Sequence, residues 1–175
     1  VCLREELFEK GNVALAVSKA GYLFGITIAL GGVLAGPSAG WQADLLGISV
    51  YGGMTVAMML VASWLCEKVL LSRFNNTKEV VEDQNLGTAF VEAGVHIANG
   101  LILLAIQQGS GAWWIGVVFW ALAQVALMVV GLVYEKATTH SIHDELERDN
   151  AAVGLAFAGV LVGMGNIISL AVAGD

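Results

Sequence analysis

Glu92, His96 and Lys19 are ionisable side chains within otherwise apolar stretches of the sequence. Glu92 and His96 are four residues apart, a spacing that places both on one face of a helix, and Asn99 follows on the same side. A carboxylate can accept a proton or a cation, an imidazole can relay a proton near physiological pH, and an ammonium can supply the counter-charge. These residue types at this spacing indicate a path for protons or small cations.

The same residues also fit a purely structural role. Lys19 and Glu92 could form an ion pair between two helices while His96 bonds to a neighbouring helix, and such a pair fixes helix register without carrying ions. The sequence contains no phosphate-cradling loop, nucleophile elbow, CxxC or HExxH. His140 and His143 lack a third firm metal ligand. We therefore expect no enzyme activity, no cofactor and no metal site.

The helices that must position these residues are expected to span a membrane. Hydrophobic side chains make up 57% of the 175 residues, charged ones 13%, and the mean hydropathy is +0.76. Five stretches are long enough to cross about 30 Å of hydrocarbon: 13–36, 48–66, 86–106, 111–134 and 151–174. The sequence therefore predicts an all-α, polytopic membrane helical bundle in a single transmembrane domain, 1–175. We expect its partners to be the lipid bilayer and either further copies of the chain or other membrane subunits, not nucleic acid.

Three segments of the chain share one pattern, which aligns on Asn12, Asn85 and Asn150. An acidic residue stands three positions before each asparagine: Glu9, Glu82 and Glu147. The pattern indicates parallel two-helix repeats with copies at about 1–36, 48–108 and 111–175. Since the first copy is incomplete, we expect a sixth span before residue 1.

Each asparagine is expected to cap the helix that follows it, because Asn accepts a hydrogen bond from an unpaired amide of the first turn. A ligand-binding role stays open, in which the three acidic clusters form a vestibule that attracts cations. Small residues recur downstream in each copy and are expected to let helix backbones approach closely. They include Gly21, Gly25, Gly94, Gly159 and Gly163.

The motif E-x-Φ-E-x-x-N followed by A-G-x-x-x-G resembles the YjfL-like family, domain of unknown function 350. The resemblance rests on Glu9, Asn12, Ala20, Gly21 and Gly25 and on their counterparts in the other copies. It implies a bacterial inner-membrane protein with paired helices, and it brings no established reaction. The second copy departs from the motif, since Ala98 replaces the last glycine.

Two functions are compatible with these patterns. The first is a cation or proton channel or transporter built from tandem repeats, in which Lys19, Glu92, His96 and Asn99 line the path. The alternative is a membrane scaffold or accessory subunit that docks a cytoplasmic partner on its acidic face. Transport requires the charged side chains to face water or one another within the bundle, whereas a scaffold permits them to be dry and bonded.

The orientation follows from the seven basic residues that lie outside the predicted spans, because all of them are on one side. These are Arg4, Lys10, Lys68, Arg73, Lys78, Lys136 and Arg148. The sequence therefore predicts a cytoplasmic start and an external end. Cysteines introduced one at a time should react with a membrane-impermeant reagent from outside at position 110 and not at position 73. Labelling at position 73 but not at position 110 would show that the orientation is the reverse of the predicted one.

Overall fold

The computed structural model describes residues 2–36, 38–72, 75–109 and 112–174, and no strand occurs in these ranges. The helices are η1 (Glu5–Glu9), α1 (Val13–Leu34), α2 (Trp41–Leu65), η2 (Cys66–Leu70), α3 (Asn76–Val81), α4 (Leu86–Gln108), α5 (Trp113–Ala137), α6 (Ile142–Glu147) and α7 (Ala151–Ala173). Five of them, with η2 continuing α2, are long and apolar enough to cross a membrane. The predicted all-α membrane bundle with five spans is confirmed.

One boundary differs clearly from the prediction. The second span was predicted to begin at residue 48, but α2 already begins at Trp41. Asp44 lies in the first turn of α2, where an acidic side chain favours the positive end of the helix dipole. Its carboxylate also accepts the Ala39 N–H at 2.9 Å. A search for uncharged stretches stops at such a residue, although here it stabilises the start of the helix.

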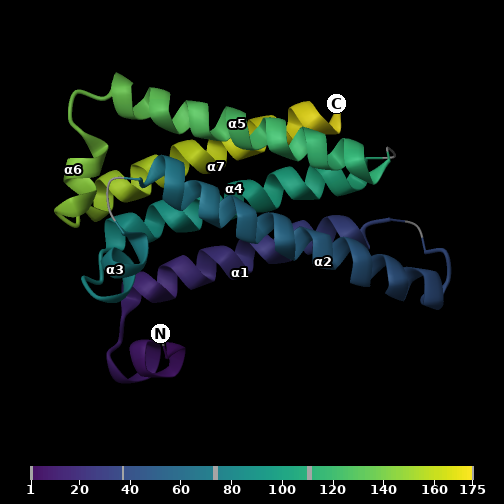
Figure 1. Ribbon diagram of the computed structural model, residues 1–175, viewed down its shortest axis with the longest axis horizontal. Helices are drawn as coiled ribbons and strands as arrows, with labels where there is room; N and C mark the ends of the chain where they lie inside the picture. The colour runs from purple at the N-terminus through teal and green to yellow at the C-terminus, as the bar shows by residue number, and fades with distance from the viewer. Residues whose placement is uncertain (1, 37, 73–74, 110–111, 175) are drawn as a thin grey trace.

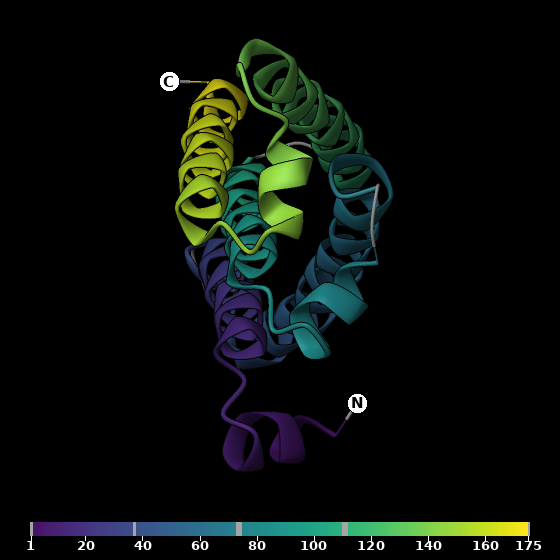
Figure 2. The same ribbon diagram turned by 90° about the vertical axis from the view of Figure 1, so that its left-hand side faces the viewer.

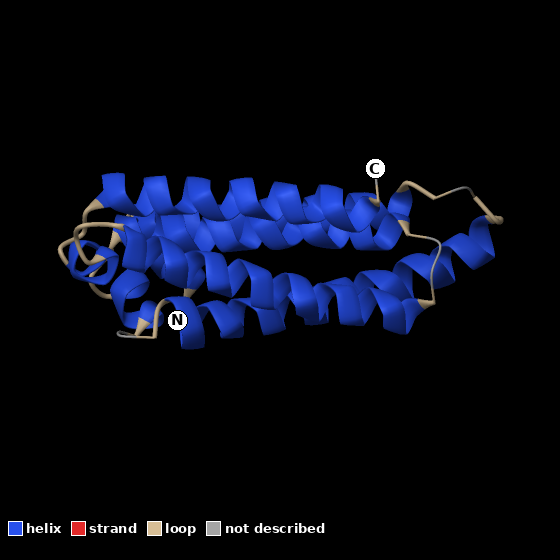
Figure 3. Cartoon of the chain, turned by 90° about the horizontal axis from the view of Figure 1, so that it is seen from above, coloured by secondary structure: helices blue, strands red, loops and turns tan. Residues whose placement is uncertain are grey.

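The long helices form two layers. The most extensive contacts in the structure join α1 to α4 and α4 to α7, so these three helices form a row with α4 in the middle. Figure 2 shows the row end-on, with α2 and α5 in the second layer beside it. In the view of Figure 1, α3 and α6 lie near one another at one end of the bundle and the C-terminus lies toward the other. Figure 3 shows the long helices running side by side along the length of the molecule.

The chain has the same local structure at each of the three asparagines. The residue immediately before each one has a positive φ: Gly11 at 64°, Gln84 at 53° and Asp149 at 56°. This left-handed residue turns the chain from a short helix into a long one. The asparagine side chain then accepts the N–H three residues later, at 2.9 Å for Asn12, 2.8 Å for Asn85 and 3.3 Å for Asn150. We call the end of the bundle where these residues lie the cap end.

Small residues allow the row to pack at backbone distance. A Cβ atom placed on Gly21 would lie 2.4 Å from the Ala93 Cβ, and one on Gly25 would lie 2.2 Å from the His96 carbonyl oxygen. Between α4 and α7, a Cβ on Gly94 would lie 2.8 Å from the Ala158 Cβ. Larger side chains at these three positions would force the helices apart.

The expected helix contacts of Gly159 and Gly163 are wrong within this chain. Both glycines are exposed, and a Cβ on either would have nothing within 4 Å. Helix α7 instead turns Gly154 and Gly165 toward α4, where added Cβ atoms would lie 2.2 Å from the Gly87 carbonyl oxygen and 2.6 Å from the Ala98 Cβ. Small residues run along two faces of α7, and their spacing alone does not indicate which face packs inward.

We expect Gly154→Leu to destabilise the protein, because its side chain would meet the backbone of α4. Overpacking of this kind costs about 1–3 kcal/mol. Gly53→Leu is a matched control, since Gly53 is an exposed mid-helix glycine with nothing within 4 Å of its added Cβ. Unfolding titrations with sodium dodecyl sulfate would measure both variants. Equal midpoints for Gly154→Leu and the wild type would contradict the close contact of α4 with α7.

Candidate functional site

Helix α4 carries a line of polar side chains at steps of three or four residues. Its members are Asn85, Thr88, Glu92, His96, Asn99 and, beyond Leu103, Gln107. This spacing places them on one face of the helix. The apolar part of α4 is 67% buried inside the structure, whereas the apolar part of each other long helix is at most 33% buried. The line, which we call the α4 stripe, therefore lies among helices rather than along lipid.

Glu92 is half-buried and bonds to α1. Its Oε2 accepts a hydrogen bond of 2.6 Å from the Ser18 hydroxyl, and the Asn76 side chain lies close to the same carboxylate. Lys19 is exposed, and within the described residues it forms no ion pair with Glu92. The ion pair of Lys19 with Glu92, which the sequence left open as a structural role, is therefore not formed between these two described residues. Neighbouring residues on a helix point about 100° apart, so α1 turns Ser18 to α4 and Lys19 away from it.

His96 is buried where α4 meets both α1 and α2. Its Nδ1 atom lies 3.5 Å from the Ser63 hydroxyl oxygen of α2. The Tyr22 ring of α1 meets the imidazole edge-on, with ring centroids 5.2 Å apart. The imidazole thus continues from Glu92 along the stripe and has polar neighbours on two helices.

Asn99 connects the stripe to α5. Its Oδ1 accepts a 2.6 Å hydrogen bond from the Gln124 side chain, and its Nδ2 donates to the Val95 carbonyl at 3.0 Å. Among the described residues, the Gln124 Oε1 atom is buried without a partner, as is the indole nitrogen of Trp120. The Gln124 amide thus joins α5 to α4. The sequence pattern did not identify Ser18, Ser63 or Tyr22, because these neighbours come from other helices.

Gln107 lies where the stripe reaches the end of the bundle opposite the caps. Its amide donates to the Thr55 hydroxyl of α2, so it joins α4 to α2. Gln107 also lines a cavity of about 440 Å³ between the ends of the long helices. Leu103 and Trp120, both buried, lie on the helices between this cavity and Asn99.

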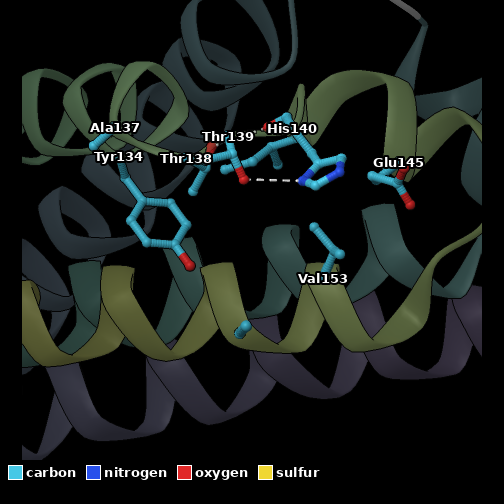
Figure 4. A pocket seen from close by; sticks show the side chains of 9 residues that line it. Tyr134, Ala137, Thr138, Thr139, His140, Glu145 and Val153 are labelled. Carbon is cyan, nitrogen blue, oxygen red and sulfur yellow. Dashed lines mark hydrogen bonds between the residues drawn. The ribbon is translucent and has the colours of Figure 1, made fainter.

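A second cavity, also of about 440 Å³, lies at the cap end between α5, α6 and α7. Figure 4 shows Tyr134, His140 and Glu145 around it, with the His140 ring bonded to the Thr139 hydroxyl. His143 lies outside this cavity and joins three segments. Its Nδ1 is 2.6 Å from the Glu135 carboxylate and its Nε2 is 2.9 Å from the Leu70 carbonyl oxygen. No pattern in the sequence predicted this bridge.

The acidic residues of the motif lie on separate short segments. Glu9, Glu82 and Glu147 are all exposed. Nearby, the hydrogen bond from Lys10 to Glu6, at 2.6 Å, lowers the pKa of the Glu6 carboxyl and raises the pKa of the Lys10 ammonium. In the described part of the chain, no three His, Cys, Asp or Glu side chains are grouped so as to hold a metal ion.

Comparison with known proteins identifies one family. A family model described as a Domain of Unknown Function (DUF350) matches residues 1–106 and 110–175. No curated protein and no solved structure matches the chain.

The Asn99–Gln124 bond generates a prediction for stability. Asn99→Leu or Gln124→Leu alone should lower the free energy of unfolding by about 1–3 kcal/mol, because each leaves a buried amide without its partner. The double variant should lose less than the sum of the two, since it removes both polar groups. Chemical unfolding of the purified protein would measure this cycle. Strictly additive losses would show that the two amides do not stabilise one another.

Proposed function

Since the chain belongs to the DUF350 family, whose description assigns no activity, we propose a function from its own residues: it conducts protons or a small cation along the α4 stripe. The observation that supports this proposal is the position of the α4 stripe, whose titratable and hydrogen-bonding side chains lie among the helices on the most buried of the long helices. A carboxylate and an imidazole one turn apart inside a membrane bundle are costly to keep there, and in membranes such groups commonly mark ion paths.

The cap end supplies the entry in this proposal. Glu92 stands seven residues after Asn85, about 10 Å along the helix at 1.5 Å per residue. Its carboxylate can accept a proton there, and the imidazole of His96, one turn further, can take it up at one ring nitrogen and release it from the other. The Ser18 and Ser63 hydroxyls beside these groups both donate and accept hydrogen bonds.

The apolar part of the path lies between Asn99 and Gln107. Leu103 is 1% exposed and Trp120 is 8% exposed, so proton transfer across this step requires water to enter from the cavity at Gln107. Hydrophobic constrictions of this kind gate membrane pores by wetting and drying. We therefore place the slow step of conduction at Leu103.

We also propose that the protein lies in a bacterial inner membrane with the cap end in the cytoplasm. Every described Lys or Arg except Lys19 lies in or next to the segments of the cap end, and cytoplasmic segments are enriched in these residues. Arg73, Ser110 and Asp175, which also carry the predicted orientation, lie outside the described residues.

The scaffold alternative is favoured by one observation, the exposure of Glu9, Glu82 and Glu147 at the cap end. A basic cytoplasmic partner could bind such a surface by charge complementarity. This alternative needs no path through the bundle, so it predicts no ion flux, and a flux measurement separates the two functions.

The purified protein in liposomes that enclose a pH-sensitive dye provides the test. We expect it to dissipate an imposed proton gradient faster than empty liposomes. Glu92→Gln retains an acceptor for Ser18 but cannot take up a proton at neutral pH, so it should slow dissipation by about tenfold or more. Glu82→Gln is the control, because it removes an exposed carboxylate at the cap end, and it should leave the rate unchanged.

Repeating the assay with gradients of potassium or sodium separates a proton path from a cation path. Wild-type rates equal to those of empty liposomes for all three ions would refute conduction and leave the scaffold. Equal slowing by Glu92→Gln and Glu82→Gln would assign the effect to surface charge rather than to the stripe.

A further inference from the structure

The row of α1, α4 and α7 is built from one contact used twice. In the first contact, α1 contributes Gly21 and Gly25, which stand nine and thirteen residues after its capping Asn12. They pack on Ala93 and His96 of α4, eight and eleven residues after the next capping asparagine. We call the surface at positions nine and thirteen after the cap the front face of a helix. The surface at positions eight, eleven and fifteen is its back face.

The second contact uses the same positions. Helix α4 presents its front face, Gly94 and Ala98, to the back face of α7, where Ala158 and Gly165 stand eight and fifteen residues after Asn150. In both contacts, small residues bring the two backbones together. Helix α4 therefore uses one face for the preceding helix of the row and a different face for the following one.

The cap end repeats in the same way. The Asn12 amide donates to the Val81 carbonyl oxygen at 3.1 Å, and the Asn85 amide donates to the Leu146 carbonyl oxygen. Val81 and Leu146 each stand four residues before the asparagine of the following unit. Each of these asparagines thus holds the short helix of the next unit. Within the described residues, the Asn150 amide donates to Glu145 of its own unit, at 2.8 Å, and to no following unit.

Both ends of the row leave these surfaces uncovered. The front face of α7, Gly159 and Gly163, is exposed, with nothing within 4 Å of added Cβ atoms. At the other end, the back face of α1 is also exposed, including Ala20 and Thr27, eight and fifteen residues after Asn12. Phe8, four residues before Asn12, is 84% exposed, and Figure 2 shows its segment apart from the bundle.

We propose that copies of this chain associate head to tail, with the front face of α7 in one copy packed on the back face of α1 in the next. A second copy is the occupant that the structure specifies, because it carries the complementary face at the same distance from the cap as in both internal contacts. Asn150 of the first copy would donate to the Phe8 carbonyl of the second, as Asn12 and Asn85 do within the chain. Since the two surfaces differ, the contact is heterologous and produces a ring or an open row. It does not depend on the proposed conduction.

Disulfide crosslinking in the native membrane tests the pairing of faces. At the internal contact of α4 with α7, Ala98 meets Gly165. Ala98 is at position thirteen on the front face of α4, and Gly165 is at position fifteen on the back face of α7. The equivalent pair between copies is Gly163 with Thr27. In a full chain whose Cys2 and Cys66 are serine, Gly163→Cys co-expressed with Thr27→Cys should form an oxidised dimer. A chain that carries both substitutions should form a ladder of higher multimers.

The controls distinguish the head-to-tail contact from other associations. The Gly163→Cys variant alone and the Thr27→Cys variant alone should each remain an uncrosslinked monomer. A symmetric dimer would instead crosslink through one of these cysteines and its copy in the partner. Gly53→Cys, exposed on α2, should not pair with Gly163→Cys. The proposal would be overturned if one single-cysteine variant formed dimers while Gly163→Cys and Thr27→Cys did not crosslink to each other. It would also be overturned if no pair of variants formed a crosslinked product.

A second measurement does not depend on cysteine geometry. Native mass spectrometry of the full chain released from lipid nanodiscs should detect multimers of the wild type and of Gly53→Leu. Gly163→Leu should lose them, because its side chain blocks the front face of α7 without meeting any atom of its own chain. A wild type that is a single chain in nanodiscs, or multimers of Gly163→Leu equal to those of the wild type, would refute the contact.

Discussion

The close approach of α1 and α7 to α4 is the contact on which the rest of the structure depends. It is possible only because glycine or alanine stands wherever the backbones meet, as at Gly25 and Gly154. Lipid provides no hydrophobic drive for helices to associate, so dispersion contacts at short range must supply the stability of the row. With α1 and α7 on two sides and the second layer beside them, α4 becomes the most enclosed of the long helices.

This enclosure is what makes a polar stripe tolerable. Glu92 facing lipid would have no partner, whereas at the contact with α1 it accepts the Ser18 hydroxyl. Asn99 likewise meets Gln124 of α5. The capping asparagines set the depth of these side chains, because they fix where each long helix begins and tie the short helix of the following unit beside it. Packing and capping together therefore determine which polar side chains of α4 lie in the interior and which neighbours they meet.

Sequence patterns predicted the helices well, but they predicted poorly which helix faces and which side chains contact one another. The apolar stretches and the asparagine caps follow from local physics, since span length and unpaired amides at a helix start depend on nearby residues alone. The packing face of α7 does not follow from local physics. Gly154 and Gly159 belong to two different stripes of small residues, and the sequence favours neither stripe as the one that packs on α4. The Lys19–Glu92 pair failed for the same reason. Equal depth on two helices was visible in the sequence, but the rotation that selects Ser18 over Lys19 depends on the neighbouring helix.

The three units agree where structure requires it and differ where the stripe lies. Eleven residues after each cap stand Leu23, His96 and Leu161. Fourteen residues after it stand Ile26, Asn99 and Met164. Caps and small residues build the row, so they recur, whereas at these two positions of α1, α4 and α7 only α4 carries polar side chains. Association through α1 and α7 would thus leave each stripe within its own chain. If the stripe conducts as proposed, an assembly of this kind would multiply independent paths and would not create a shared central pore.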